Sequence, residues 1–128
     1  MMDPLLQQQY IEQYIKAYNA FDTEAMLANL HEAIEFKNIS DGEVNMHTKG
    51  IEAFRQQAEQ VRQFFQTREQ RLTNLSFDTD TVTVEINYHA VLAMDLPNGM
   101  KKDDELKLKG KSIFRFKDHK IIAITDIS

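Results

Sequence analysis

The four histidines are the first side chains to test for chemistry, because imidazole serves as a metal ligand and as a base near neutral pH. They stand at His31, His47, His89 and His119, and no two are separated by two or four positions. Metal-binding histidines on one helix or strand recur at such short spacings. We therefore expect no metal site, and only His47 is kept as a candidate base.

Several catalytic classes need residues that this sequence lacks. It has no cysteine, so a thiolate nucleophile, a disulfide framework and a cysteine-based zinc or iron–sulfur site are excluded. Its four glycines form no phosphate-binding loop, no nucleophile elbow and no dinucleotide fingerprint. We expect the protein to work without a cofactor.

The charge balance argues against polyanionic partners. Fifteen Lys and Arg stand against twenty Asp and Glu, so a net charge of −5 gives no overall attraction to nucleic acid or to an anionic membrane. Five basic residues alternate along one stretch, and we expect them on a solvated or subunit-facing strand surface: Lys107, Lys109, Lys111, Arg115 and Lys117. The chain shows no signal-peptide pattern and no long apolar run, which predicts a cytoplasmic protein with one domain over residues 1–128.

The elements that must position any site begin with a helix. Asp3 precedes Pro4, and a capping carboxylate before proline is typical of a helix start. Apolar residues then recur every three or four positions for about sixteen residues, with Tyr14 and Tyr18 on the apolar face and Gln7 on the opposite one.

Two further helices are predicted. Asp22 has the chemistry of a helix cap, and the short helix that follows it is expected to carry Leu30 and to end at His31. Apolar residues return to helical spacing over residues 51–66, which places Phe65 in the last turn of the third helix.

The first strand is predicted where the apolar period changes to two, from Ile34 onward. Phe36 and Asn38 then point to one face, and Glu35 to the other. A slip of one residue would turn Glu35 inward as a candidate base, but it would expose Phe36 to solvent.

The remaining strands are predicted over residues 44–48, 72–77, 82–94, 106–117 and 121–127, with a turn at Asn98-Gly99. Tyr88 and His89 lie on opposite faces, and the apolar neighbours of Tyr88 assign it to the inner one. Helices gathered before an antiparallel meander indicate an α+β fold, a curved antiparallel sheet wrapped around the helices as a cone. We expect aromatic side chains to line the ligand space inside it: Tyr18, Phe36, Phe65, Tyr88 and Phe114.

The order of these segments resembles the nuclear transport factor 2-like superfamily, which has a cystatin-like, cone-shaped fold. Within it the sequence is most similar to ketosteroid isomerases and SnoaL-like polyketide cyclases. The resemblance covers essentially the whole chain, and these segments carry it: residues 14–25, the strand around Phe36 and Asn38, Gly50-Ile51-Glu52-Ala53-Phe54, and residues 113–121.

Three catalytic positions carry over from that resemblance. The oxyanion-hole tyrosine of ketosteroid isomerases falls on Tyr14, the general-base aspartate on Asn38 and the neutral aspartic acid on Ser112. An amide cannot take up a proton, so Asn38 excludes the usual steroid-type base at its position. Tyr14 is left as a hydrogen-bond donor, with Asn38 and Ser112 orienting substrate or water.

The resemblance implies a pocket for a small apolar molecule that bears an oxygen, with or without turnover. Cofactor-independent isomerisation, cyclisation, dehydration or hydrolysis would all fit such a pocket. The alternative is a non-catalytic dimerisation or protein-interaction module of the same fold. The family also implies a homodimer through the outer face of the sheet, where Val91, Ile113 and Ile122 could lie.

Overall fold

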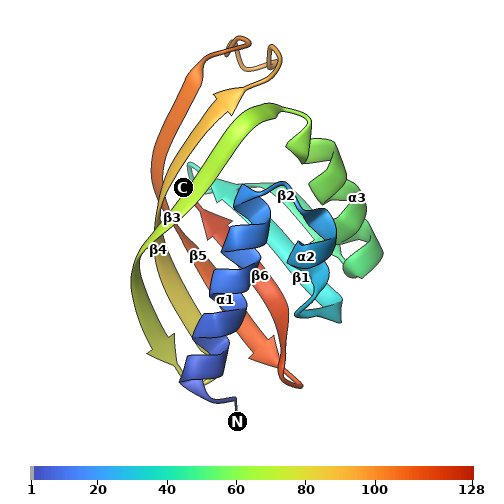
Figure 1. Cartoon of the computed structure of the whole chain (residues 1–128), viewed down its shortest axis with the longest axis vertical. Helices are drawn as coiled ribbons and strands as arrows, with labels where there is room; N and C mark the ends of the chain where they lie inside the picture. The colour runs from blue at the N-terminus through green and yellow to red at the C-terminus, as the bar shows by residue number, and fades with distance from the viewer. Residues whose placement is uncertain (1) are drawn as a thin grey trace.

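The computed structural model describes residues 2–128, in which three helices cover one face of a strongly curved six-stranded sheet (Figure 1). The α+β architecture predicted from the sequence is confirmed. In chain order the elements are α1 (Pro4–Asn19), α2 (Thr23–Leu27), β1 (Leu30–Ser40), β2 (Glu43–Lys49), α3 (Ile51–Arg62), β3 (Phe65–Asp78), β4 (Thr81–Leu92), β5 (Glu105–Lys117) and β6 (Lys120–Ile127).

The two predicted helix caps are present. The Asp3 carboxylate accepts a hydrogen bond from the Leu5 backbone N–H at 2.8 Å, and the Asp22 carboxylate accepts one from Ala25 N–H at 3.1 Å. These bonds satisfy amide groups that the first turn of a helix leaves without partners.

Two predicted helix ends are wrong. The second helix stops at Leu27, and His31 belongs to β1, because Leu30 pairs with Ile121 of β6. The third helix stops at Arg62, and Phe65 opens β3, where it pairs with Leu92. In both places pairing with a distant strand overrides a local helical spacing.

The strand order in the sheet is β2-β1-β6-β5-β4-β3. Neighbours run antiparallel except for β1 and β6, which are parallel. The hairpin signals in the sequence predict the β3 to β6 meander, but they carry no information about β1 beside β6. That parallel pair brings the ends of the two strands together.

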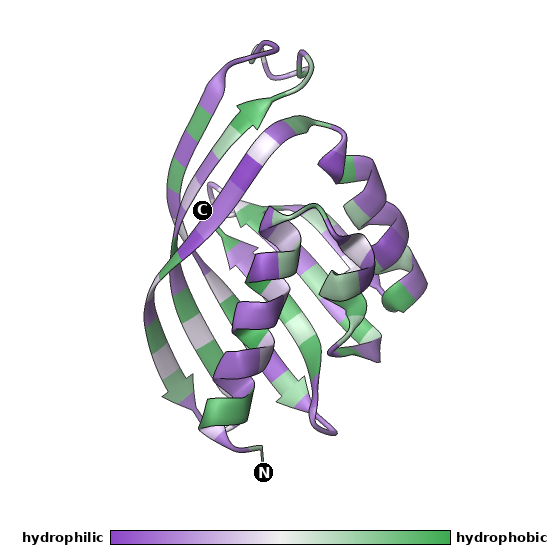
Figure 2. Cartoon of the chain, in the orientation of Figure 1, coloured by the Kyte–Doolittle hydropathy of each residue, from purple (hydrophilic) through white to green (hydrophobic). Residues whose placement is uncertain are grey.

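The core lies between α1 and the concave face of the sheet. Ile11 and Ile15 of α1 are buried, and alternate strand residues meet them, as the banding of apolar and polar residues in Figure 2 shows. Gln7 departs from its predicted exposure: it is 1 % exposed, and its Nε2 donates to the Thr79 carbonyl at 3.2 Å. Its amide joins α1 to the β3–β4 turn.

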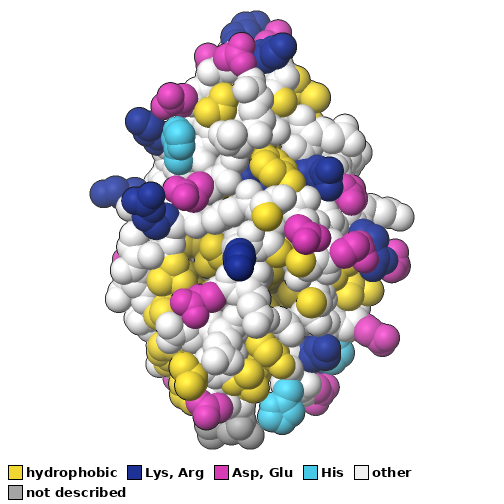
Figure 3. Space-filling view, in the orientation of Figure 1, with side chains coloured by type: hydrophobic (Ala, Val, Ile, Leu, Met, Phe, Trp, Pro, Cys, Tyr) yellow, Lys and Arg dark blue, Asp and Glu magenta, His cyan; other side chains and the backbone are white. Residues whose placement is uncertain are grey.

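Acidic and basic side chains are mixed on the face that carries the helices (Figure 3). Of the basic stripe, Lys107 lies 3.6 Å from Glu105 of the same strand. Within residues 2–128, no helix is both long and apolar enough to cross a membrane.

Candidate functional site

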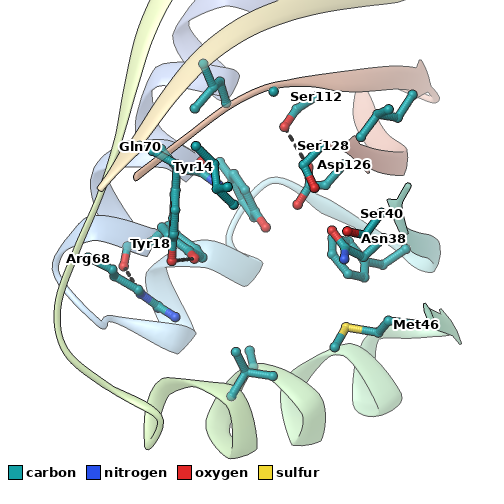
Figure 4. Close-up of a pocket in the computed structure, with 18 of the residues that line it drawn as sticks. Tyr14, Tyr18, Asn38, Ser40, Met46, Arg68, Gln70, Ser112, Asp126 and Ser128 are labelled. Carbon is teal, nitrogen blue, oxygen red and sulfur yellow. Dashed lines mark hydrogen bonds between the residues drawn. The ribbon is translucent and has the colours of Figure 1, made fainter. Parts of the chain in front are cut away.

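A cavity of about 340 Å³ lies between α1, α3 and the inner face of the sheet (Figure 4). Its volume is within the range of small-molecule sites. Aromatic side chains from several elements form much of its wall: Tyr14, Tyr18, Phe36, Phe54, Phe65 and Tyr88. Its polar side chains gather around Asp126 and around Arg68.

Asp126 of β6 is the carboxylate of this cavity. In the sheet register it stands opposite Asn38 of β1 and Ser112 of β5, so three adjacent strands bring these side chains together. The Ser112 hydroxyl donates to Asp126 Oδ1 at 2.6 Å. Burial raises the pKa of the Asp126 carboxyl to about 6, although the Ser112 hydrogen bond lowers it.

Tyr14 of α1 faces the same group. Its ring is held by Phe114 edge-on at 5.7 Å and by Phe54 at 6.4 Å between ring centres. Burial first, and then the negative charge of Asp126, raises the Tyr14 pKa well above its usual value. Tyr14 is therefore a neutral phenol at physiological pH, able to donate a hydrogen bond.

Asn38 lines the cavity from β1, directly before a bulge in the β1–β2 pairing. Its Nδ2 donates to Asn45 Oδ1 at 2.8 Å. This bond orients the amide from outside the cavity.

The side chains around Arg68 form a second polar region. Tyr18 and Tyr88 share a hydrogen bond of 2.8 Å between their hydroxyls. Arg68 of β3 is buried, its guanidinium carbon lies 3.7 Å from the Tyr18 ring centre, and its Nε donates to the Tyr18 carbonyl at 2.9 Å. In Figure 4 Arg68 and Tyr18 lie on the side of the pocket away from Asn38 and Met46.

The structure brings together the three positions carried over from the resemblance, since Tyr14, Asn38 and Ser112 all line this cavity. Their catalytic roles stay predictions. The predicted binding residues Tyr18, Phe36, Phe65 and Tyr88 line it as well, Phe65 from a strand where a helix was expected.

Phe114 corrects the predicted binding set. It is not among the lining residues; it is 1 % exposed and packs in the core behind the Tyr14 ring. The alternation along β5 assigns its side correctly, but the body of Tyr14 separates its ring from the cavity. Phe114 supports the wall without forming it.

The two alternative bases do not reach the cavity. His47 Nε2 lies 2.7 Å from Glu35 Oε2, and neither residue lines the pocket. The hydrogen bond with His47 is the largest cause of a lowered Glu35 pKa; burial opposes it, and the charges of Lys37, His47 and Lys49 add to the lowering. The register that keeps Phe36 inward holds this pair on the other face.

Sequence reasoning missed Asp126 and Arg68. Asp126 alternates with Ile127 and Thr125 in a short terminal strand, and nothing local distinguishes it from a solvated aspartate. Arg68 falls in the polar first half of β3, which the sequence assigned partly to a helix. Alternation counted back from Leu72, which packs against the core, would have placed Gln70 and Arg68 on the inner face. Counted from Phe65 it would not, because the pairing with β4 shifts register between Phe65 and Thr67.

No group of three or more His, Asp or Glu side chains gathers as a metal site in residues 2–128. The charged residues that line the cavity are Asp126, the buried Arg68 and Lys111, which is exposed; the other polar groups are phenols, hydroxyls and amides. Such a set can bind an oxygen atom, hold an anion and move a proton.

The comparisons with known proteins agree with this fold. The family model for a SnoaL-like domain matches residues 11–124. A search of proteins with curated functions finds no match.

Solved structures resemble the fold over nearly its whole length. A candidate polyketide cyclase from Xanthomonas campestris pv. campestris has 22 % identity and a TM-score of 0.81, covering 97 % of this chain and 90 % of that one. A candidate SnoaL-like polyketide cyclase from Jannaschia sp. CCS1 has 11 % identity and a TM-score of 0.82, covering 98 % and 88 %. A nuclear transport factor 2-like protein of unknown function from Burkholderia pseudomallei K96243 has 14 % identity and a TM-score of 0.75, covering 98 % and 90 %. At these identities the likeness shows the fold alone.

Proposed function

The chain belongs to the SnoaL-like domain family, and from that premise we propose that it is a cofactor-independent acid–base catalyst. Its substrate is a small, flat, mostly apolar molecule that carries a carbonyl oxygen. The observation that supports this most is the Asp126 carboxyl, which lies in an aromatic cavity with a pKa raised to about 6. A base with a pKa near the working pH is both available and strong enough to take a proton from carbon.

In the proposed reaction Asp126 removes a proton from the carbon beside the carbonyl. Ser112 holds Oδ1 of the carboxylate at 2.6 Å, which leaves Oδ2 to face the substrate. Tyr14 donates a hydrogen bond to the carbonyl oxygen as negative charge develops on it. Asn38 offers its carbonyl oxygen as a positioning acceptor, since its Nδ2 is bound to Asn45.

The enolate formed in this way can react further in two ways, neither of which needs a second reagent. Asp126 can return the proton to a different carbon, which is isomerisation. Alternatively the enolate carbon attacks a second carbonyl of the same molecule, and the Asp126 proton goes to the new alkoxide, which is cyclisation. Both are favoured by the largely apolar surroundings that the six aromatic side chains supply.

The test uses a probe whose reaction is one proton removal from carbon, the ring opening of 5-nitrobenzisoxazole. We expect the wild-type rate to rise with pH through an apparent pKa of about 6 and to fall about 100-fold or more in Asp126→Asn. Asp118→Asn, which removes an exposed carboxylate beside His31, is the matched control and is expected to keep the rate. A wild-type rate no higher than that of Asp126→Asn would contradict the proposal and favour the non-catalytic module.

We also propose that two copies associate through the outer face of the sheet. Ile113 lies in register with Thr83 and Thr125, which gives this face an uncharged spot between Lys111 and Arg115. Val91 and Ile122, the other predicted interface residues, are likewise partly exposed. Light scattering on the wild type is expected to give a dimer, with Ile113→Lys monomeric and Leu5→Lys, an exposed change on α1, still dimeric; a monomeric wild type would overturn this.

A further inference from the structure

Arg68 is a buried cation that the proposed proton transfer does not use. It is 5 % exposed, and in the part of the chain that the structure describes no carboxylate forms a salt bridge with it. Removing a guanidinium from water costs several kcal/mol unless other groups compensate it. A buried arginine without an acidic partner therefore requires an explanation.

Part of the compensation comes from the protein itself. The guanidinium lies over the Tyr18 ring at 3.7 Å and the Phe21 ring at 4.5 Å, both within the range of a cation–π contact. Its Nε donates to the Tyr18 carbonyl near the C-terminal end of α1, where a positive charge is favourable. These contacts fix the plane and the position of the guanidinium.

They leave most of its hydrogen-bonding capacity unused. A guanidinium has five N–H groups. Among the described residues, the Tyr18 carbonyl accepts from Nε, and a side-chain hydrogen bond from Arg68 also lowers the Tyr18 pKa. The fully buried side-chain atoms that have no hydrogen-bond partner belong to Thr23, Thr48 and Gln57. The two terminal nitrogens of Arg68 are not in that set. Arg68 lines the cavity, so its terminal N–H groups are available to an occupant of the cavity.

The strand that carries Arg68 is anchored to hold it there. The Asn19 side chain, at the end of α1, donates to the Gln70 carbonyl at 3.1 Å and accepts from the Gln70 N–H at 2.8 Å. The Tyr18–Tyr88 hydroxyl pair closes the adjacent wall, and the Arg68 charge opposes the rise that burial causes in both tyrosine pKa values. The guanidinium is thus a preorganised positive centre among uncharged tyrosine and glutamine side chains.

We infer that Arg68 binds a carboxylate of the substrate, so that the substrate class is an aromatic carboxylic acid. This inference rests on the proposed function, because it places the carboxylate at Arg68 and the reacting carbonyl near Asp126 and Tyr14. A carboxylate matches the planar fork of a guanidinium and accepts two parallel N–H bonds from it. At a pH above 6 the anionic Asp126 disfavours a carboxylate at its own side of the cavity, so the bound acid takes one orientation.

The experiment compares two ligands of the same shape and different charge, 2-naphthoate and 2-naphthamide, titrated by calorimetry at pH 7.5. Wild type is expected to bind the carboxylate about tenfold or more tightly than the amide. Arg68→Gln is expected to abolish that preference while keeping the affinity for the amide. Arg62→Gln is the matched control, because Arg62 also donates to a backbone carbonyl, that of Phe21, but lies outside the cavity.

A wild type that binds both ligands equally, or an Arg68→Gln that loses both in proportion, would overturn the inference. NMR of the arginine Nε–H signals in the wild type does not depend on how a variant folds. There we expect 2-naphthoate to shift one buried signal and the amide to leave it in place; no shift with the carboxylate would also overturn the inference.

Binding and proton transfer are measured separately, so their failures are distinguishable. A preference for the carboxylate without proton transfer in the wild type would contradict the catalytic proposal alone. Proton transfer from 5-nitrobenzisoxazole without a carboxylate preference would contradict the Arg68 assignment alone.

Discussion

At Asp126, burial disfavours the ionised carboxylate that the proposed proton transfer requires. Its folded-state pKa of about 6 lies above the usual value of 3.8, so the folded protein holds that proton more tightly than the unfolded chain does. The resulting stabilisation is fully present below pH 3.8 and is lost as the pH rises through about 6. The difference between the two pKa values corresponds to about 3 kcal/mol.

Asp126→Asn removes this penalty while retaining an oxygen that can accept from Ser112. Relative to wild type, we expect the variant to gain about 3 kcal/mol of unfolding free energy between pH 4 and pH 8. Urea denaturation across that range measures the gain. Asp118→Asn should show a difference from wild type that hardly changes with pH; a flat difference for Asp126→Asn would contradict the assigned burial.

Asn38→Asp tests how close the two strand ends are. Asn38 and Asp126 are register partners on parallel strands and line one cavity, so a second carboxylate there repels the first. We expect the higher of the two coupled pKa values to rise by about one unit or more above that of Asp126 in the wild type. Carboxyl NMR titration measures it.

The matched control for Asn38→Asp is Asn45→Asp, which places its charge on the exposed strand β2. It should cause a smaller shift. An unchanged Asp126 titration in Asn38→Asp would show that the two side chains do not share the cavity.

At the scale of elements, the site depends on how α1 is fixed to β3. β3 is an edge strand, and its outer N–H and C=O groups need partners other than another strand. Asn19 supplies both at Gln70 through one side-chain amide. The contact keeps Arg68 and Tyr18 against each other.

Asn19→Ala is expected to cost about 1–3 kcal/mol of unfolding free energy, because it leaves two part-buried backbone groups without partners. Hydrogen exchange at the Gln70 amide should speed up with it. Asn74→Ala, an exposed change on the same strand, is the control. Unchanged exchange at Gln70 would mean that the amide pair does not anchor the strand.

At the scale of the whole molecule, the cavity interrupts a core that would be more stable if it were filled. Ala58 of α3 lies in the cavity wall and against the core, so a larger side chain there can occupy the empty space. We expect Ala58→Phe to keep or raise the Tm and to abolish 2-naphthoate binding, the exchange of stability for function seen at many sites.

Gln60→Phe adds the same ring on an exposed position of α3 and should leave binding unchanged. Retained binding in Ala58→Phe would show that the ligand occupies another site.

Local sequence pattern is enough to establish the class of fold and most of the cavity wall. Periodicity identifies the inward faces of α1, β1, β4 and β5, because one buried face imposes a period of 3.6 or 2 on the residues that form it. Tyr14, Tyr18, Phe36 and Tyr88 are therefore assigned to the interior by the sequence alone, and the order of elements indicates the family.

The positions of the buried charges depend on the tertiary structure. Asp126 and Arg68 are ordinary charged residues in their local sequence, and only the placement of β1 beside β6, and of β3 against the end of α1, buries them in one cavity. A buried charge costs free energy that no local pattern reveals, because the cost arises from distant segments excluding water. The base that is missing at Asn38 is thus supplied, in our proposal, by its neighbour across the sheet.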